Sequence, residues 1–312
     1  MKAIFFGTPA FAVPSLQALC SVAEVLAVVC QPDKPAGRGR HLTIPAVKSF
    51  ALELGLPVIQ PTSIRTEGWM DWFESLQLDV ALIVAYGKLL PKRILDAPRF
   101  GCVNVHASLL PKYRGAAPIP WSILKGEHVT GITLMKLDEG TDTGDIITSV
   151  STPIGAEETA GELTQRLALV GADAVRRDLP SYLAGHLPLH PQCHEEATLS
   201  PPLRKEQGAI QWESAATSIH QHVRAFNPWP GAYTFLQGRR IKIHAVRPLI
   251  PMSPIQEPPG TVILADKSHL IVACGNHGAV EILTIQSDGG KPMQGTAFVR
   301  GRGTQTGDIF YS

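Results

Sequence analysis

The sequence predicts an α/β protein of two domains, in which a doubly wound domain with a mostly parallel sheet precedes a small β-barrel. Short apolar runs alternate with stretches of helical periodicity in the first half of the chain. The last third instead alternates apolar and polar residues with a period of two, as strands with one buried face do. A length of 312 residues suits two domains, because one domain usually takes about 150 residues.

The expected strands of the first domain are apolar throughout, as strands covered on both faces are. They are Ala3–Gly7, Val25–Cys30, Val80–Ala85 and Cys102–Val105. Three stretches between them have apolar residues at helical spacing: Pro9–Cys20, Pro45–Leu54 and Thr66–Leu76. This rhythm predicts a mostly parallel, doubly wound sheet, which binds ligands beyond the carboxyl ends of its strands. A long helix over 158–184 closes the domain, which we place at residues 1–185.

Residues 186–203 are expected to form a linker, because this stretch is proline-rich and lacks periodicity. The second domain then covers residues 204–312 and begins with a helix over Ala215–Phe226. Its alternating runs are Thr234–Leu236, Arg240–Val246, Thr261–Leu264, His269–Cys274 and Ala279–Ile285. Glycine-containing turns separate these runs, so we predict an OB-like barrel.

Composition excludes several classes of protein. With 44% hydrophobic and 18% charged residues the chain is an ordinary globular protein. Its five cysteines are odd in number and include no C-x-x-C pair, which argues against disulfides and a zinc site. The apolar run at the N-terminus is too short for a signal peptide, and no later run is long enough to span a bilayer. We therefore expect a cytoplasmic protein without a metal or a membrane partner. We also expect it to be monomeric.

The net charge of +1 is unevenly distributed. The stretch from Pro201 to Ser312 has 11 Lys and Arg against 7 Asp and Glu, so the basic excess lies in the second domain. A surplus of this size more often marks a solvated surface than a nucleic-acid site.

Candidate catalytic residues end the last predicted strand of the first domain. Asn104 and His106 are two residues apart, so their side chains point to the same side of the strand. An amide is a neutral donor and an imidazole donates or takes up protons, so the pair could hold an oxyanion and move protons. Alternatively, Asn104 caps the next turn and His106 is a structural histidine.

An acidic loop, Leu137–Asp145, lies between two strand-like runs. It superficially suggests calcium binding, but glycines stand where ligands would be needed and no glutamate follows at the twelfth position. A carboxylate beside His106 would favour the charged ring and orient it, which makes Asp142 the candidate. The alternative is a solvated turn.

These motifs together resemble the signature of the folate-dependent formyltransferases. The resemblance rests on Asn104–Pro118, which reads NVHASLLPKYRGAAP, and on Leu137–Asp145, which reads LDEGTDTGD. Two further stretches, Gln31–Arg40 and Val223–Tyr233, are similar to the branch of this family that acts on methionyl-tRNA. The likeness therefore covers nearly the whole chain.

The resemblance implies a Rossmann-like formyltransferase domain, an OB-like tRNA-binding domain, 10-formyltetrahydrofolate as formyl donor and methionyl initiator tRNA as acceptor. It makes Asn104, His106 and Asp142 the catalytic residues. The implied folate-binding residues are Tyr86, Gly87, Ser108, Leu109, Leu110, Pro111, Leu137 and Asp138, although the leucines could equally be core residues. The implied tRNA-binding residues are Lys34, Arg38, Arg40, Arg224, Arg239, Arg240 and Lys242, any of which could instead be a surface charge.

Other functions compete with this interpretation. A sugar-nucleotide amine formyltransferase, or one acting on a purine precursor, would share the three catalytic residues. A nicotinamide-dependent dehydrogenase would need G-x-G-x-x-G after the first strand, where this sequence supplies only Gly7. An RNA-binding module with an inert folate-like pocket would not transfer formyl groups at all.

Overall fold

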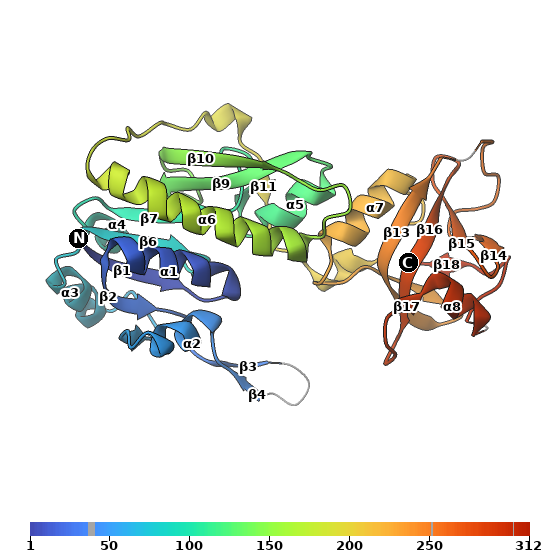
Figure 1. Cartoon of the computed structure of the whole chain (residues 1–312), viewed down its shortest axis with the longest axis horizontal. Coiled ribbons are helices and arrows are strands. Elements are labelled where there is room, and N and C mark those ends of the chain that lie inside the picture. Colours follow the sequence, from blue (N-terminus) through green and yellow to red (C-terminus); the bar gives the residue numbers. More distant parts are fainter. Residues whose placement is uncertain (37–40, 251, 302) are drawn as a thin grey trace. The chain divides into compact units, whose positions relative to one another are not determined.

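The computed structural model describes residues 1–36, 41–250, 252–301 and 303–312 (Figure 1). It contains two compact units. The first comprises Met1–Pro118, Val129–Pro153 and Thr164–Ser200, and the second comprises Ile119–His128, Ile154–Leu163 and Pro201–Ser312. No helix in the described part of the chain is long and apolar enough to cross a bilayer.

The first unit is built on a mixed sheet with the strand order β10-β9-β7-β6-β1-β2-β5. Its strands are β1 (Lys2–Gly7), β2 (Glu24–Val29), β5 (Val58–Ile59), β6 (Val80–Val84), β7 (Cys102–His106), β9 (Val129–Lys136) and β10 (Ile146–Pro153). The strands from β7 to β5 run parallel, whereas β9 and β10 form an antiparallel edge. The predicted α/β class and its parallel strands are thus confirmed.

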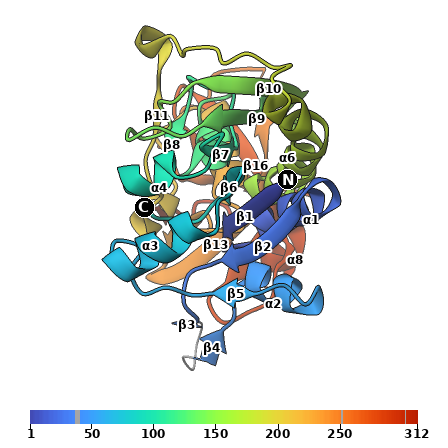
Figure 2. The same cartoon turned by 90° about the vertical axis from the view of Figure 1, so that its left-hand side faces the viewer.

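Helices cover both faces of this sheet, as a doubly wound fold requires (Figure 2). In the first unit they are α1 (Val13–Val22), α2 (Ala46–Glu53), α3 (Glu67–Ser75), α4 (Lys92–Asp96) and α6 (Ala160–Leu183) from Thr164 onward, and η1 (Ala10–Ala12) precedes α1. Helix α5 (Pro118–Leu124) belongs to the second unit from Ile119 onward. On one face Phe73 and Ile94, from α3 and α4, join a core with Phe6 and Ile83. On the other face α6 approaches β7 closely, because a Cβ at Gly171 would lie 3.0 Å from Val105 Cγ1.

Two short strands flank residues 37–40. The strands β3 (Lys34–Ala36) and β4 (His41–Thr43) are antiparallel, and Lys34 pairs with Thr43. Arg38 and Arg40, predicted to contact tRNA, lie outside the described residues.

The predicted linker is folded onto the first unit. Residues Leu199–Ser200 form β11, which pairs in parallel with β8 (Arg114–Gly115). His190 forms a backbone bridge with Ile146, and η2 covers His194–Glu196. The stretch therefore has fixed contacts that its lack of periodicity did not reveal.

The second unit is a strongly bent antiparallel sheet with the order β14-β15-β16-β13-β12-β18. Its elements are η3 (Lys205–Gly208), α7 (Ala216–Ala225), β12 (Tyr233–Leu236), β13 (Arg239–Leu249), β14 (Val262–Ala265), β15 (Leu270–Cys274), β16 (Gly278–Ser287), β17 (Met293–Gln294), α8 (Gly295–Arg300) and β18 (Phe310–Tyr311). A bridge between Thr261 and Ile309 links the two end strands. With Trp212 and Phe310 stacked in its core, this unit confirms the predicted OB-like barrel.

Candidate active site

His106 ends β7 with its imidazole almost fully buried and held by a backbone carbonyl. Its Nε2 lies 2.9 Å from the carbonyl oxygen of Tyr113. Because a carbonyl can only accept a hydrogen bond, Nε2 carries a proton in this arrangement. The backbone of Tyr113 is in the left-handed region, with φ +61°, and its carbonyl also accepts a hydrogen bond from Ser200 Oγ at 2.9 Å. These contacts fix the orientation of the ring and leave Nδ1 as the nitrogen that is not bonded to Tyr113.

Asp142 faces that remaining nitrogen. Its Oδ2 lies 3.6 Å from His106 Nδ1 and accepts a hydrogen bond from the Gly115 backbone N–H at 2.8 Å. The distance to Nδ1 is that of an ion pair when the ring is protonated. Asp142 itself has φ +53°, so the acidic loop places its carboxylate through a backbone conformation that few residues other than glycine adopt. The predicted meeting of His106 and Asp142 is present in the structure.

A buried network that the sequence did not suggest holds the Asp142 loop. Gln192, from the predicted linker, donates from Nε2 to the carbonyls of Asp142 at 3.0 Å and of Gly144 at 2.7 Å. Its Oε1 accepts hydrogen bonds from Arg114 Nε at 3.0 Å and Nη2 at 2.7 Å. Both side chains are buried. No residue type or spacing marks Gln192 as functional in sequence; only its contacts do.

Asn104 lies two residues before His106 on β7 and is partly exposed. In β7 it pairs with Ile83 of β6 and Met135 of β9, so it stands between two neighbouring strands. Among the residues that the structure describes, none forms a hydrogen bond with its carboxamide. An amide donor at the carboxyl end of a central strand is thus available to a ligand, rather than engaged in capping a turn.

The segment Ser108–Pro111, predicted to line the folate site, is anchored below the surface. Ser108 Oγ donates to the Lys112 carbonyl at 2.6 Å, and Leu110 N donates to Thr133 Oγ1 at 3.1 Å. The Leu110–Pro111 peptide bond is cis. Ser108 and Leu110 are buried, whereas Leu109 and Pro111 retain partial exposure and are the members of this segment that can contact a ligand.

The remaining predicted folate residues divide between the core and the loops. The Tyr86 ring is in the core beside Phe6, at 5.1 Å between centroids, and burial raises the pKa of its hydroxyl to about 12. Its backbone carbonyl accepts a hydrogen bond from Gln31 Nε2 at 3.2 Å. Gly87 has φ +81° and so turns the chain just past β6. The Tyr86 side chain is therefore part of the core.

Leu137 and Asp138 begin the acidic loop. Leu137 packs partly against the core, and its N–H donates to the Cys102 carbonyl at 2.8 Å. Asp138 Oδ1 accepts hydrogen bonds from Gly140 N at 3.0 Å and Thr143 Oγ1 at 2.7 Å. Asp138 therefore shapes the loop internally. No cluster of three or more metal-ligating side chains occurs among the residues described.

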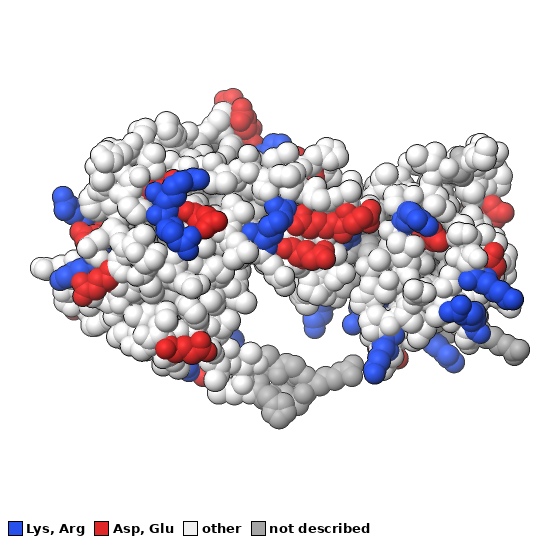
Figure 3. Space-filling view, in the orientation of Figure 1, with Lys and Arg blue, Asp and Glu red and all other residues white. Residues whose placement is uncertain are grey.

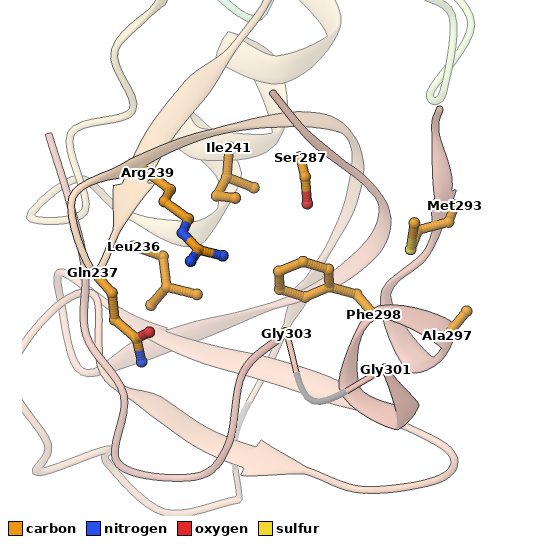
Figure 4. Close-up of a pocket in the computed structure, with 10 residues that line it drawn as sticks. All are labelled: Leu236, Gln237, Arg239, Ile241, Ser287, Met293, Ala297, Phe298, Gly301 and Gly303. Atoms are coloured by element: carbon orange, nitrogen blue, oxygen red, sulfur yellow. The ribbon is translucent and has the colours of Figure 1, made fainter. Parts of the chain in front are cut away.

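Basic side chains predominate on the barrel face that Figure 3 shows. Arg239 lines a pocket of about 320 Å³ on the barrel, and Figure 4 shows its guanidinium pointing into that pocket. Arg240 and Lys242 line a second cleft of about 410 Å³. Three of the four predicted barrel cations therefore remain available to a ligand.

Arg224 is the exception among the predicted tRNA contacts. It is half-buried on α7, and its Nη1 donates to the carbonyls of Gly155 at 3.2 Å and Glu158 at 3.1 Å. Burial lowers the pKa of its guanidinium. This geometry gives Arg224 a structural task, and we do not retain it among the proposed RNA contacts.

An α/β domain with an amide, an imidazole and a carboxylate beyond its central strands, followed by an OB-like barrel, defines a class of two-domain group-transfer enzymes. The chain belongs to the formyl transferase family. Residues 1–178 match the formyl transferase domain, and residues 202–303 match the formyl transferase C-terminal domain.

Curated relatives align over almost the full length. The chain is 50% identical to the methionyl-tRNA formyltransferase of Sorangium cellulosum over 309 residues, covering 99% of both proteins. It is 40% identical to that of Bacillus subtilis, covering 99% of this chain and 97% of the relative. Among solved structures, an N-formyltransferase from Helicobacter canadensis superposes with a TM-score of 0.65 at 17% identity, over 90% of this chain and 98% of that one. This last likeness shows the fold alone.

Proposed function

We propose that this protein transfers the formyl group of 10-formyltetrahydrofolate to the amine of methionyl initiator tRNA. The observation that carries the choice of acceptor is the near full-length identity with relatives named methionyl-tRNA formyltransferase. The geometry of His106, Asp142 and Asn104 supports the reaction type. The protein would act in the cytoplasm, with residues 1–185 as the catalytic domain and 204–312 as the RNA-binding domain.

In the proposed reaction, the neutral amine of the methionyl group attacks the formyl carbon. A new N–C bond forms, and the carbonyl oxygen becomes negative. The Asn104 amide donates a hydrogen bond to this oxygen, and His106 donates from Nδ1, because Nε2 is already engaged by Tyr113. The carboxylate of Asp142 offsets the positive charge of the ring.

Collapse of this intermediate breaks the bond between the formyl carbon and the folate nitrogen. The proton lost by the amine passes to that nitrogen, so that tetrahydrofolate leaves neutral at this atom. Asp142 lies where it can accept the amine proton in transit and stabilise His106 as the proton moves. The products are an N-formyl amide and tetrahydrofolate, with no external oxidant, reductant or metal required by the balance.

The formyl donor fits the residues at the carboxyl end of the sheet. The left-handed turn at Ala85 (φ +49°) and Gly87 (φ +81°) presents backbone groups next to the strand that bears Asn104. Such groups can hydrogen-bond the edge of a pterin ring. Leu109 and Pro111 would supply apolar contact to the donor, because they keep partial exposure on an anchored segment.

The direct test offers the purified chain and 10-formyltetrahydrofolate to three acceptors: methionyl initiator tRNA, methionyl elongator tRNA and an amino-sugar nucleotide. We expect the initiator tRNA to be formylated fastest. Faster reaction of the amino-sugar nucleotide would overturn the proposed acceptor and favour a sugar-nucleotide amine formyltransferase.

Two variants test the catalytic assignment. Asn104→Ala removes one donor to the oxyanion and should lower kcat by about 100-fold, as at comparable sites. His106→Gln keeps a polar side chain but removes the ring nitrogen that faces Asp142, and should cost at least as much. Full activity of either folded variant would remove that residue from the mechanism.

A further inference from the structure

Hydrogen bonds join the residues that follow four of the parallel strands in the first unit. Thr8, Gln31, Gln60 and Tyr86 come within two residues of the ends of β1, β2, β5 and β6. Gln31 is the central member: its N–H donates to Thr8 Oγ1 at 3.3 Å and its Nε2 to the Tyr86 carbonyl at 3.2 Å. The Gln31 carbonyl accepts a hydrogen bond from Gln60 Nε2 at 2.9 Å. These bonds connect the strand ends along the edge where ligands bind in doubly wound folds.

Two charged side chains set the orientation of the Gln60 amide. Lys48 Nζ of α2 donates to Gln60 Oε1 and to Asp33 Oδ2, each at 2.7 Å, and Gln60 Nε2 donates to Asp33 Oδ1 at 2.7 Å. An ammonium group only donates and a carboxylate only accepts, so the opposite amide orientation would lose both contacts. The hydrogen bonds from Lys48 and Gln60 lower the pKa of the Asp33 carboxyl, which therefore stays ionised near neutral pH. Lys48 and Asp33 thus hold Gln60 Nε2 toward the Gln31 carbonyl.

The turn at Tyr86–Gly87 is anchored on one side and open on the other. Besides the bond from Gln31 to the Tyr86 carbonyl, Lys88 Nζ donates to the Thr62 carbonyl at 3.2 Å. Both neighbours of Gly87 are therefore tied to segments that follow β2 and β5. Gly87 has φ +81°, and a Cβ built on it would have no heavy atom within 4 Å among the described residues outside its chain neighbours. A ligand can approach this part of the backbone without displacing a side chain.

We propose that Gln31 positions the Tyr86–Gly87 turn for the formyl donor, and that Lys48, Asp33 and Gln60 hold Gln31 in that role. This assignment rests on the proposed function, which places the donor at the turn. Without the hydrogen bond from Gln31, the turn is in place in only a fraction of the molecules. The apparent dissociation constant of the donor then rises in inverse proportion to that fraction.

The catalytic residues are not part of this network. His106 and Asp142 are hydrogen-bonded to the backbone of Tyr113 and Gly115 instead. Loss of the network should therefore weaken donor binding and leave turnover at saturating donor almost unchanged. A general loss of stability would not give this pattern, because the folded fraction would bind the donor and turn over normally.

The test titrates the full chain with 5-formyltetrahydrofolate, which carries its formyl group on another nitrogen, and measures the heat of binding. Gln31→Met keeps the length of the side chain but removes the donor to the Tyr86 carbonyl. It should raise the dissociation constant about 5-fold, which corresponds to about 1 kcal/mol. In formyl transfer, the KM for 10-formyltetrahydrofolate should rise by a similar factor, and kcat should change less than about 2-fold.

A second variant tests the connection through Gln60. Lys48→Met removes the hydrogen bonds to Gln60 and Asp33 and should raise the dissociation constant about 3-fold. Combined with Gln31→Met, it should add nothing, because the connection to the turn is already broken. Lys48→Arg keeps a cationic donor and should restore most of the affinity.

Arg177→Met is the matched control. Arg177 Nε in α6 lies 2.6 Å from Asp178 Oδ1, so this substitution also leaves a largely buried carboxylate without its cation. Donor affinity and kcat should both stay normal in this variant. Thermal unfolding midpoints above the assay temperature would establish that every variant is folded.

Two results overturn the assignment. One is an unchanged dissociation constant in folded Gln31→Met protein, and the other is a double variant in which the two effects simply multiply. A wild-type chain that does not bind 5-formyltetrahydrofolate would overturn the proposed donor as well. If the wild-type chain binds this folate but does not formylate tRNA, only the proposed acceptor is wrong, and the titrations still decide the role of Gln31.

Discussion

Gln192 is the residue through which the loop bearing Asp142 can be loosened without touching a catalytic side chain. Gln192→Met keeps the length of the side chain but removes its four hydrogen bonds, two to loop carbonyls and two from Arg114. Each neutral bond contributes about 1 kcal/mol and each bond from the guanidinium about 1.5 kcal/mol, so the loss of unfolding free energy is at most ~5 kcal/mol. Because the bonds share partners and the site relaxes, we expect a loss of about 3 kcal/mol.

The assay has two parts. Urea unfolding should show the lower free energy of unfolding with an unchanged slope. Formyl transfer by the folded fraction should show kcat lowered by roughly 10-fold or more, since a misplacement of about 1 Å at a catalytic group has large effects. The KM for the formyl donor should change less, because the segment with Leu109 and Pro111 is held by a separate hydrogen bond, from Leu110 N to Thr133 Oγ1.

Two further variants separate positioning from stability. Gln192→Glu restores a partner for Arg114 but sets a carboxylate oxygen against the Asp142 and Gly144 carbonyls, so kcat should stay low while part of the stability returns. Gln286→Met in the barrel removes hydrogen bonds to His244 and Gly290 and should leave kcat unchanged. A folded Gln192→Met protein with normal kcat would refute the idea that Gln192 positions Asp142.

Other regions give independent predictions. Tyr86→Phe removes a buried hydroxyl that has no hydrogen-bond partner among the described residues, and should raise the unfolding free energy by about 1 kcal/mol in urea titrations; a decrease would show that the hydroxyl is satisfied. Gly144→Ala would place a Cβ 1.9 Å from the Lys136 carbonyl oxygen and should cost about 1–3 kcal/mol of stability together with activity; an unchanged melting point would contradict this. Burial lowers the pKa of His222, and the hydrogen bond to the Gly208 carbonyl offsets only part of the effect. The unfolded chain, with an ordinary His pKa of about 6.5, therefore binds the proton more readily, so stability is lost as the pH falls below about 6.5. His222→Gln should reduce that loss between about pH 7.5 and about pH 5.5; an identical loss in both proteins would speak against it.

The parallel strands could be predicted from sequence because burial on both faces leaves a strong local signal. Val80–Val84 is apolar at every position and fully buried, and the predicted strand differs from it by one residue. The barrel strands could also be predicted, because apolar and polar residues alternate along them, as in Tyr233–Leu236. Helix α8, at Gly295–Arg300, was not predicted, since six residues with two small ones carry little periodicity.

Site residues could be predicted from sequence only where reactive side chains interrupt a recognisable local pattern. Asn104 and His106 stand out because a strand that ends in polar residues contradicts its own apolar pattern. Gln192 and Ser200 carry no such signal, since both lie in an aperiodic, proline-rich stretch and are buried by contacts with residues more than 40 positions away. Burial of a polar side chain by distant backbone is a tertiary property, and no window along the sequence contains it.

The orientation of the His106 ring depends on a contact at each of its two nitrogens. The Tyr113 carbonyl fixes the proton on Nε2, and this carbonyl is presented by a left-handed backbone and engaged from behind by Ser200. Asp142 then has only Nδ1 to act on. If the carboxylate alone oriented the ring, either nitrogen could face it, and the ring could rotate during turnover. In the mechanism that we propose, a carbonyl on one side and a carboxylate on the other would leave Nδ1 as the one nitrogen that exchanges a proton with the reactants, so the same nitrogen would serve every cycle.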